Sequence, residues 1–225
     1  MFKKSLLGLL LISPFSALAH PHAFIDMQTK TLVKDNQLIG FSTQWLLDEA
    51  SSSAVLYDVK QAKGDKAAQQ KLIDEVMENV VNEHYFSYVF DKENHKIKYT
   101  KRPENYGMRV KGNEVEYYFD FLLAQPQALQ NNEFTLMTYD STYYVAMRYA
   151  ETGKSAVDFS SLPANCKGEV LEPNVDEKIK SYASSLDKSQ KNEVKTDRTL
   201  YRLIGDYFRL ATLAFCTSSR LAKSL

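Results

Sequence analysis

The sequence contains little glycine, proline, cysteine and histidine, and it has no long apolar run. Glycine occurs 8 times and proline 6 times in 225 residues, whereas tyrosine occurs 14 times and phenylalanine 12 times. So little glycine is unusual for an all-β protein, while the aromatic residues favour strands. We therefore expect an α+β fold: a mainly antiparallel β sheet or sandwich with one clear amphipathic helix and further helical excursions.

Several catalytic motifs are also missing. The sequence contains no P-loop, no dinucleotide-binding glycine fingerprint, no G-x-S-x-G elbow and no H-E-x-x-H pair. Only 4 histidines are available for acid–base chemistry. No pair of carboxylates points to a hydrolase, so we expect that the protein is not an enzyme.

The first residues are typical of a secretory signal. Lys3 and Lys4 precede the apolar run 6–12, and Ala17-Leu18-Ala19 is a small-residue cleavage site. We expect a signal peptide over 1–19, export to the periplasm, and one α+β domain over 20–225 with a helical insertion around 50–84. The apolar run is too short to cross a bilayer, and no later segment reaches about 18 apolar residues. The sequence therefore predicts no membrane-spanning segment.

The charges of the chain are balanced, with 28 basic and 28 acidic side chains. Removal of the signal takes away two lysines and no acid, which leaves the mature chain slightly acidic. This balance argues against nucleic acid as a partner.

The two cysteines, Cys166 and Cys216, stand far apart in the sequence. An even pair in an oxidising compartment indicates a disulfide. The alternative is a metal or redox pair, but the C-x-x-C spacing of such pairs is absent.

Cleavage after Ala19 would make His20 the first residue, followed by Pro21 and His22. A terminal histidine offers both an α-amine and an imidazole to a transition metal. Proline favours an extended chain, in which residues two apart share a face, so His20 and His22 can bind one ion. Pro21 also lacks the backbone N–H that a square-planar amino-terminal chelate needs. Imidazole ligands suit copper, nickel and zinc.

Further ligands and a competing interpretation accompany this pair. Asp26 lies on the same strand face by even spacing, and His84, at the carboxyl end of a predicted helix, is a third candidate nitrogen ligand. Helix capping is the simpler role for His84. Two histidines near a new terminus are also compatible with a frayed, solvated chain end.

Periodicity predicts the elements that carry these residues. Alternation predicts a hairpin of strands 23–33 and 39–47, which places the histidine end near Asp48 and Glu49. A short helix follows at 50–59, with Ser51 to Ser53 as cap candidates, and the clearest amphipathic helix covers 66–84. A β region over 85–150 contains an idle, exposed His95 and a turn with Asp140. The simplest role of Asp140 is a bond to the backbone, and the alternative is a contact that orients a histidine. A polar, helical or mobile excursion follows at 175–191. Residues 199–218 form either one helix or, as we favour, a helix that turns into a strand over about 208–217, beside the Cys166 segment.

The chain resembles a family of bacterial periplasmic proteins described as the periplasmic component of an ABC-type transport system. The resemblance rests on His20-Pro21-His22-Ala23-Phe24-Ile25, Gln44-Trp45-Leu46-Leu47-Asp48-Glu49, Tyr117-Tyr118-Phe119-Asp120-Phe121, Tyr139-Asp140-Ser141-Thr142-Tyr143-Tyr144 and the late cysteine pair. Members of that family often occur beside nickel/cobalt permeases. The resemblance therefore implies a divalent-metal transport context with an inner-membrane metal permease as partner.

Together these features predict a metal-binding accessory protein for nickel or cobalt, with copper or zinc as rivals. Its metal ligands would be His20 and His22, with His84 or Asp26 completing the site. Two other functions stay open. One is a non-catalytic docking β-domain that binds a membrane transporter without metal. The other is a copper redox enzyme of the amino-terminal histidine-brace type.

Overall fold

The structure is a computed structural model that describes residues 23–140, 144–149, 156–171 and 210–216. The predicted signal peptide over 1–19, His20 and His22, the excursion at 175–191 and the helix expected from 199 all lie outside the described residues. The rest forms two β sheets and two helices, which confirms the predicted α+β, β-rich class.

The first sheet has the strand order β5-β6-β2-β1-β8, and β9 also pairs with β1. Its strands are β1 (Ala23–Lys34), β2 (Gln37–Leu47), β5 (Glu104–Lys111), β6 (Glu114–Ala128), β8 (Val145–Tyr149) and β9 (Val157–Asp158). The predicted hairpin of β1 and β2 is present. Its two turn residues, Asp35 and Asn36, have φ angles of 51° and 58°, as a tight hairpin turn requires. Pairing is antiparallel except that β8 and β9 run parallel to β1.

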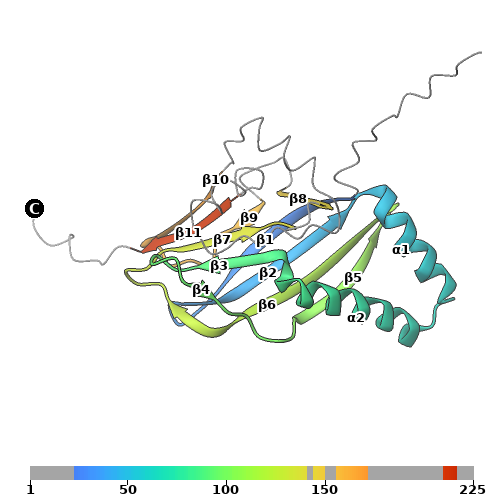
Figure 1. The fold of residues 1–225 in the computed structure, drawn as a ribbon, viewed down its shortest axis with the longest axis horizontal. Helices are drawn as coiled ribbons and strands as arrows, with labels where there is room; N and C mark the ends of the chain where they lie inside the picture. Colours follow the sequence, from blue (N-terminus) through green and yellow to red (C-terminus); the bar gives the residue numbers. More distant parts are fainter. Residues whose placement is uncertain (1–22, 141–143, 150–155, 172–209, 217–225) are drawn as a thin grey trace, which may run out of the picture.

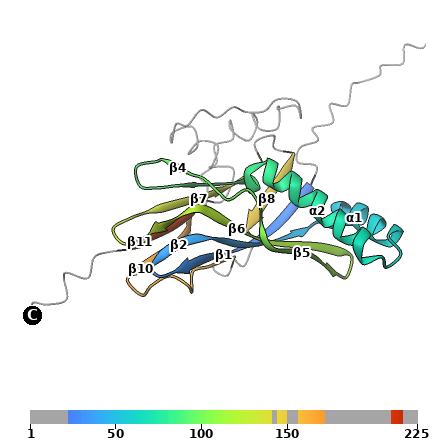
Figure 2. The same cartoon turned by 90° about the horizontal axis from the view of Figure 1, so that it is seen from below.

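The second sheet has the order β10-β11-β7-β3-β4. Its strands are β3 (Ser87–Phe90), β4 (Lys96–Ile97), β7 (Phe134–Thr138), β10 (Cys166–Leu171) and β11 (Leu210–Cys216). β11 lies within the predicted strand at 208–217 and pairs with β10, as expected. Figure 2 shows β4 and β7 in a layer distinct from β1 and β2.

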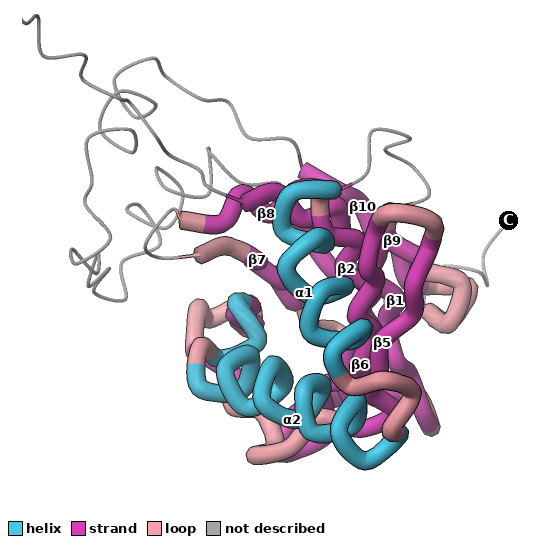
Figure 3. Tube along the Cα trace, turned by 90° about the vertical axis from the view of Figure 1, so that its right-hand side faces the viewer, coloured by secondary structure: helices cyan, strands magenta, loops and turns pink. Residues whose placement is uncertain are grey.

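Two helices connect the sheets. α1 (Glu49–Gln61) and α2 (Lys66–Asn82) lie between β2 and the short helix η1 (His84–Phe86). In Figure 1 they occupy one end of the molecule and β10 and β11 the other. Figure 3 shows the two helices meeting at an angle. Among the described residues, neither helix has both the length and the apolar character needed to span a membrane.

One hydrophobic core joins these layers. It contains side chains of the first sheet (Met27, Phe41, Trp45, Phe119, Phe121), of the second sheet (Val89, Phe134, Leu136) and of α2 (Ile73, Met77, Val80). The alternating burial along β1 and β2 follows the pleat, so one face of the hairpin enters the core and the other faces outward. The start of β1, to which the predicted metal ligands are attached, pairs with β2 on one side and with β8 on the other.

The helix ends differ from the sequence-based expectation. α1 begins at Glu49, and its cap is Asp48, not one of the serines at 51 to 53. The predicted helix 66–84 ends at Asn82, and the amide of Glu83 donates to the carbonyls of Asn79 and Val81. His84 therefore follows the helix and does not cap it. It begins a turn in which His84, Tyr85 and Phe86 have φ angles of 54°, 58° and 49°.

Candidate functional site at the start of the first strand

Asp48 fixes the first residues of β1 from the opposite end of the hairpin. The Phe24 amide donates to Asp48 Oδ2 at 2.6 Å, and the Asp48 amide donates to the Phe24 carbonyl at 3.0 Å. The antiparallel register produces this meeting, because Ile25 pairs with Leu47 and Asp48 follows directly. The chain is thus held two residues after His22.

The same carboxylate caps α1. Asp48 Oδ1 accepts the Ser51 amide at 2.8 Å, and Oδ2 accepts the Ser51 hydroxyl at 3.1 Å. Burial tends to raise the pKa of Asp48, but the hydrogen bonds from Ser51, Phe24 and the Ala50 amide outweigh burial and lower it. Asp48 and Glu49 do not continue the strand, because the chain enters α1 at Glu49.

Asp26 also lies near the start of β1, but its carboxylate is already paired with an arginine. Arg148 of β8 donates to both of its oxygens, with Nη2 at 3.3 Å from Oδ2. The Arg148 guanidinium also lies 5.8 Å from the centre of the Phe24 ring, which is 41% exposed. The parallel pairing of β1 and β8 places Asp26 directly opposite Arg148. A metal ion at Asp26 would have to compete with this cation.

A second carboxylate approaches the start of β1 from the other side. Asp140 is only 5% exposed, and its Oδ2 accepts the Val145 amide at 3.0 Å. Val145 is the register partner of Ala23, the first residue of β1. This backbone bond agrees with the role predicted for Asp140. Asp48 and Asp140 therefore flank the point where the histidine segment joins the sheet.

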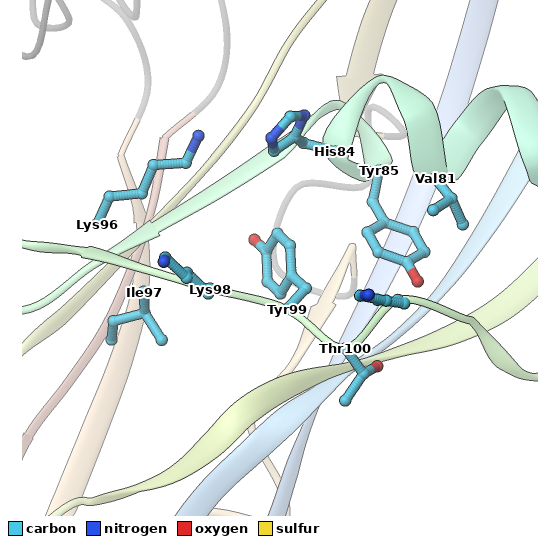
Figure 4. Close-up of a pocket in the computed structure, with 9 residues that line it drawn as sticks. Val81, His84, Tyr85, Lys96, Ile97, Lys98, Tyr99 and Thr100 are labelled. Atoms are coloured by element: carbon cyan, nitrogen blue, oxygen red, sulfur yellow. The ribbon is translucent and has the colours of Figure 1, made fainter.

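His84, the third predicted nitrogen ligand, belongs to a different environment. Its ring stacks on Tyr88, with 6.3 Å between ring centres, and the ammonium of Lys96 lies 4.4 Å from the centre of the same Tyr88 ring. In Figure 4, His84 and Lys96 lie on the same side of a pocket that also contains Tyr85 and Tyr99. These cationic surroundings do not attract a metal ion.

Sequence reasoning missed one group of metal-type ligands. One ligand atom each from Asp91, Glu93 and His95, in the turn between β3 and β4, lies within 4.8 Å of the others. His95 is exposed as expected but not idle, because Asp91 accepts its amide at 2.7 Å and lies 3.2 Å from its Nδ1. The D-x-E-x-H spacing inside a turn was the available signal. Since the bonds between Asp91 and His95 suffice to hold this turn, the geometry alone does not indicate an ion.

The cysteines lie at the opposite end of the fold. Cys166 is disulfide-bonded, and Cys216, the other cysteine of the chain, is its direct register partner across β10 and β11. The disulfide therefore links β10 to β11, the last described strand.

Comparisons with known proteins identify the family. Residues 5–208 match the family described as "Protein of unknown function (DUF1007)", and the chain belongs to that family. It is similar to an "Uncharacterized protein" of Haemophilus influenzae, with 63% identity over 188 residues, which cover 84% of this chain and 89% of the relative. No solved structure matches the chain.

Proposed function

We propose that this member of the family is a periplasmic metal-binding accessory protein of a divalent transition-metal transport system, with an inner-membrane metal permease as partner. Nickel or cobalt would be the cargo, with copper and zinc as rivals. His20 would supply its amine and imidazole, and His22 a second imidazole. The function is non-catalytic.

The observation that carries the proposal is the double hydrogen bond between Phe24 and Asp48. It holds the backbone only two residues from His22, at 2.6 and 3.0 Å. A ligand pair attached to a fixed strand loses less conformational entropy on binding an ion than a pair on a free tail. The flanking carboxylates Asp48 and Asp140 add negative charge that favours a cation.

Asp26 and His84 are weaker candidates than His20 and His22, because each has a positively charged neighbour. The carboxylate of Asp26 is bonded to Arg148, and the His84 ring and the Lys96 ammonium both contact the Tyr88 ring. A metal ion at Asp26 would have to displace the guanidinium, and one at His84 would be repelled by the ammonium. The proposal therefore rests mainly on His20 and His22, while Asp26 and His84 are candidates for completing the site.

The test begins with the exported protein. Intact mass spectrometry of periplasmic material should give a chain that starts at His20, and it should gain the mass of one ion when nickel or cobalt is added. Titration calorimetry with nickel, cobalt, copper and zinc should then show one site. Addition of one glycine before His20 should weaken binding strongly, because the amine no longer chelates with the imidazole of the same residue.

Single alanine variants of the four histidines separate the possible sites. His20→Ala and His22→Ala should each lower the affinity at least tenfold, equivalent to about 1.4 kcal/mol. If affinity depends on His95 instead, the ion binds in the β3–β4 turn and the proposal is wrong. A different mature start, or no binding of any of the four metals, would also overturn it. If the alanine variants of His20 and His22 capture the permease as well as the wild type does, docking is independent of metal.

A further inference from the structure

A cavity of about 420 Å³ lies where the end of α2 meets the segment that crosses between the two sheets. β4 pairs with β3 in the second sheet, whereas Tyr99, two residues later, bridges to Leu123 of the first sheet. The Thr100 amide donates to the Leu122 carbonyl at 2.8 Å, so the crossing segment is fixed. The cavity is within the size range of small-molecule sites. The residues that determine its chemistry are His84, Tyr85, Lys96, Lys98, Tyr99 and Lys101.

The cavity is strongly basic. Within the described residues, Lys96, Lys98 and Lys101 form no ion pair with a carboxylate, although most of the exposed salt bridges elsewhere involve lysine. Lys96 lies against the Tyr88 ring, and burial lowers the pKa of its ammonium. An anion bound beside Lys96 would favour its charged form again. The electrostatic field of the cavity therefore selects negative charge.

Two tyrosines that line this cavity have buried hydroxyls without acceptors. Tyr85 is 1% exposed, and neither its hydroxyl nor that of Tyr99 has a hydrogen-bond partner among the described residues. Burial raises the pKa of Tyr85 to about 12 and that of Tyr99 well above its ordinary value, so both remain protonated donors. Buried donors are almost always paired, and an anionic oxygen is a strong acceptor for a donor that lacks a partner.

The cavity wall is pre-formed. The Tyr85 ring stacks on Phe121 with 5.1 Å between centres and meets Tyr99 edge-on at 5.5 Å. This packing fixes the turn over 84–86, and Figure 4 shows His84 and Tyr99 on the same cavity. The Val81 and Ile97 side chains add apolar surface. The wall thus offers cations and an apolar side, and two buried tyrosine hydroxyls lie behind it.

We infer that this lysine–tyrosine cavity binds a small organic anion. The carboxylate or phosphate oxygens of the anion accept hydrogen bonds from Tyr85 and Tyr99 and pair with Lys96 and Lys98. The apolar wall contacts the carbon skeleton. This site involves neither His20 nor His22 and does not depend on the proposed metal function.

The test uses titration calorimetry on the full mature chain at constant ionic strength. The probes are citrate, glucose 6-phosphate and uncharged glucose. Citrate or glucose 6-phosphate should bind at one site, and whichever binds identifies the oxyanion as carboxylate or phosphate. Glucose should not bind. If neither anion binds above the salt background, or if glucose binds as well as glucose 6-phosphate, the inference is overturned.

Charge-matched variants separate a specific site from general attraction. Lys96→Gln/Lys98→Gln should lower the affinity for the anion at least tenfold, as expected for loss of charge-assisted bonds. Lys34→Gln/Lys60→Gln removes the same charge from exposed positions outside the cavity and should leave the affinity unchanged. Equal losses in the two double variants would overturn the inference. Tyr99→Phe keeps the ring and should weaken binding severalfold, and unchanged urea unfolding would show that the variant is folded.

Discussion

Replacement of Asp48 tests the physical basis of the proposed metal site. Its carboxylate accepts two bonds from Ser51 at the start of α1 and one from the Phe24 amide at 2.6 Å. Loss of a helix cap costs about 1 kcal/mol, and loss of a hydrogen bond to a charged group costs about 1.5 to 3 kcal/mol. We therefore expect Asp48→Ala to lower the free energy of unfolding by about 2 to 4 kcal/mol.

Asp48→Asn divides this loss into its parts. Asparagine caps helices as well as aspartate does, but it has only one acceptor oxygen. This oxygen can accept the Ser51 amide, and the Phe24 amide then loses its partner. We expect a loss of about 1.5 to 3 kcal/mol, from the Phe24 contact alone. Glu49→Gln, at the next and exposed position, removes a charge without a cap and should change stability by less than about 1 kcal/mol.

Urea unfolding, followed by the fluorescence of Trp45, measures these differences at constant slope m. The wild-type advantage over Asp48→Ala should be complete at neutral pH and disappear as the pH falls below about 4. The sign follows from the lowered pKa of Asp48: the folded state binds the proton less tightly than the unfolded chain, so protonation destabilises it. If Asp48→Ala unfolds within about 0.5 kcal/mol of wild type, Asp48 does not anchor β1.

Three further changes test the packing. Tyr85→Phe removes an unpartnered buried hydroxyl. In anion-free buffer the free energy of unfolding, measured with urea, should stay unchanged or rise by about 1 kcal/mol. A loss of about 1 kcal/mol or more would show that the hydroxyl has a hydrogen-bond partner. Gly40→Ala should cost about 1 to 3 kcal/mol, because its Cβ would lie 2.4 Å from the Phe121 carbonyl oxygen, and an unchanged unfolding midpoint would contradict this contact. Cys166→Ser/Cys216→Ser should cost about 4 kcal/mol through the entropy of the opened loop, with reduced wild type as the comparison in thermal unfolding.

Most of the sheet could be predicted from the sequence, because strands of this kind carry period-two alternation. The hairpin of β1 and β2 and that of β5 and β6 have clear turn residues, Asp35-Asn36 and Gly112-Asn113. The sequence also placed the chain start near Asp48, since a hairpin returns to its own beginning. These are local or next-neighbour relations.

The role of Asp48 could not be assigned in the same way. Aspartate followed by serine residues fits a strand end, a turn or a cap, and the serines at 51 to 53 compete for the same role. The structure decides for Asp48 because the register brings the Phe24 amide to the same carboxylate. Sequence rules for helix caps consider only neighbouring residues, and they cannot include the bond from Phe24, which lies on the other strand of the hairpin.

The cavity was still less accessible to sequence reasoning. Lys96, Lys98 and Lys101 lie in a polar stretch whose simplest interpretation is a solvated strand, and Tyr85 lies just beyond a helix. They meet because the segment after β4 leaves one sheet for the other and Tyr99 bridges to Leu123. Such a crossing is set by long-range pairing, which local periodicity does not report.

The turn at 84–86 explains why a large aromatic ring occupies this junction. Left-handed backbone costs about 1 to 2 kcal/mol for each residue other than glycine, so three consecutive residues cost about 3 to 6 kcal/mol. Burial of a tyrosine that is 1% exposed removes about 150 to 250 Å² from water, which stabilises by about 4 to 6 kcal/mol at the usual coefficient. The two terms are of equal size, so the ring of Tyr85 holds the turn. Phenylalanine should preserve the turn, whereas Tyr85→Ala should release it and move His84 away from the lysines. Because both variants lack the hydroxyl, a greater loss of anion binding in Tyr85→Ala than in Tyr85→Phe would report the change in the turn.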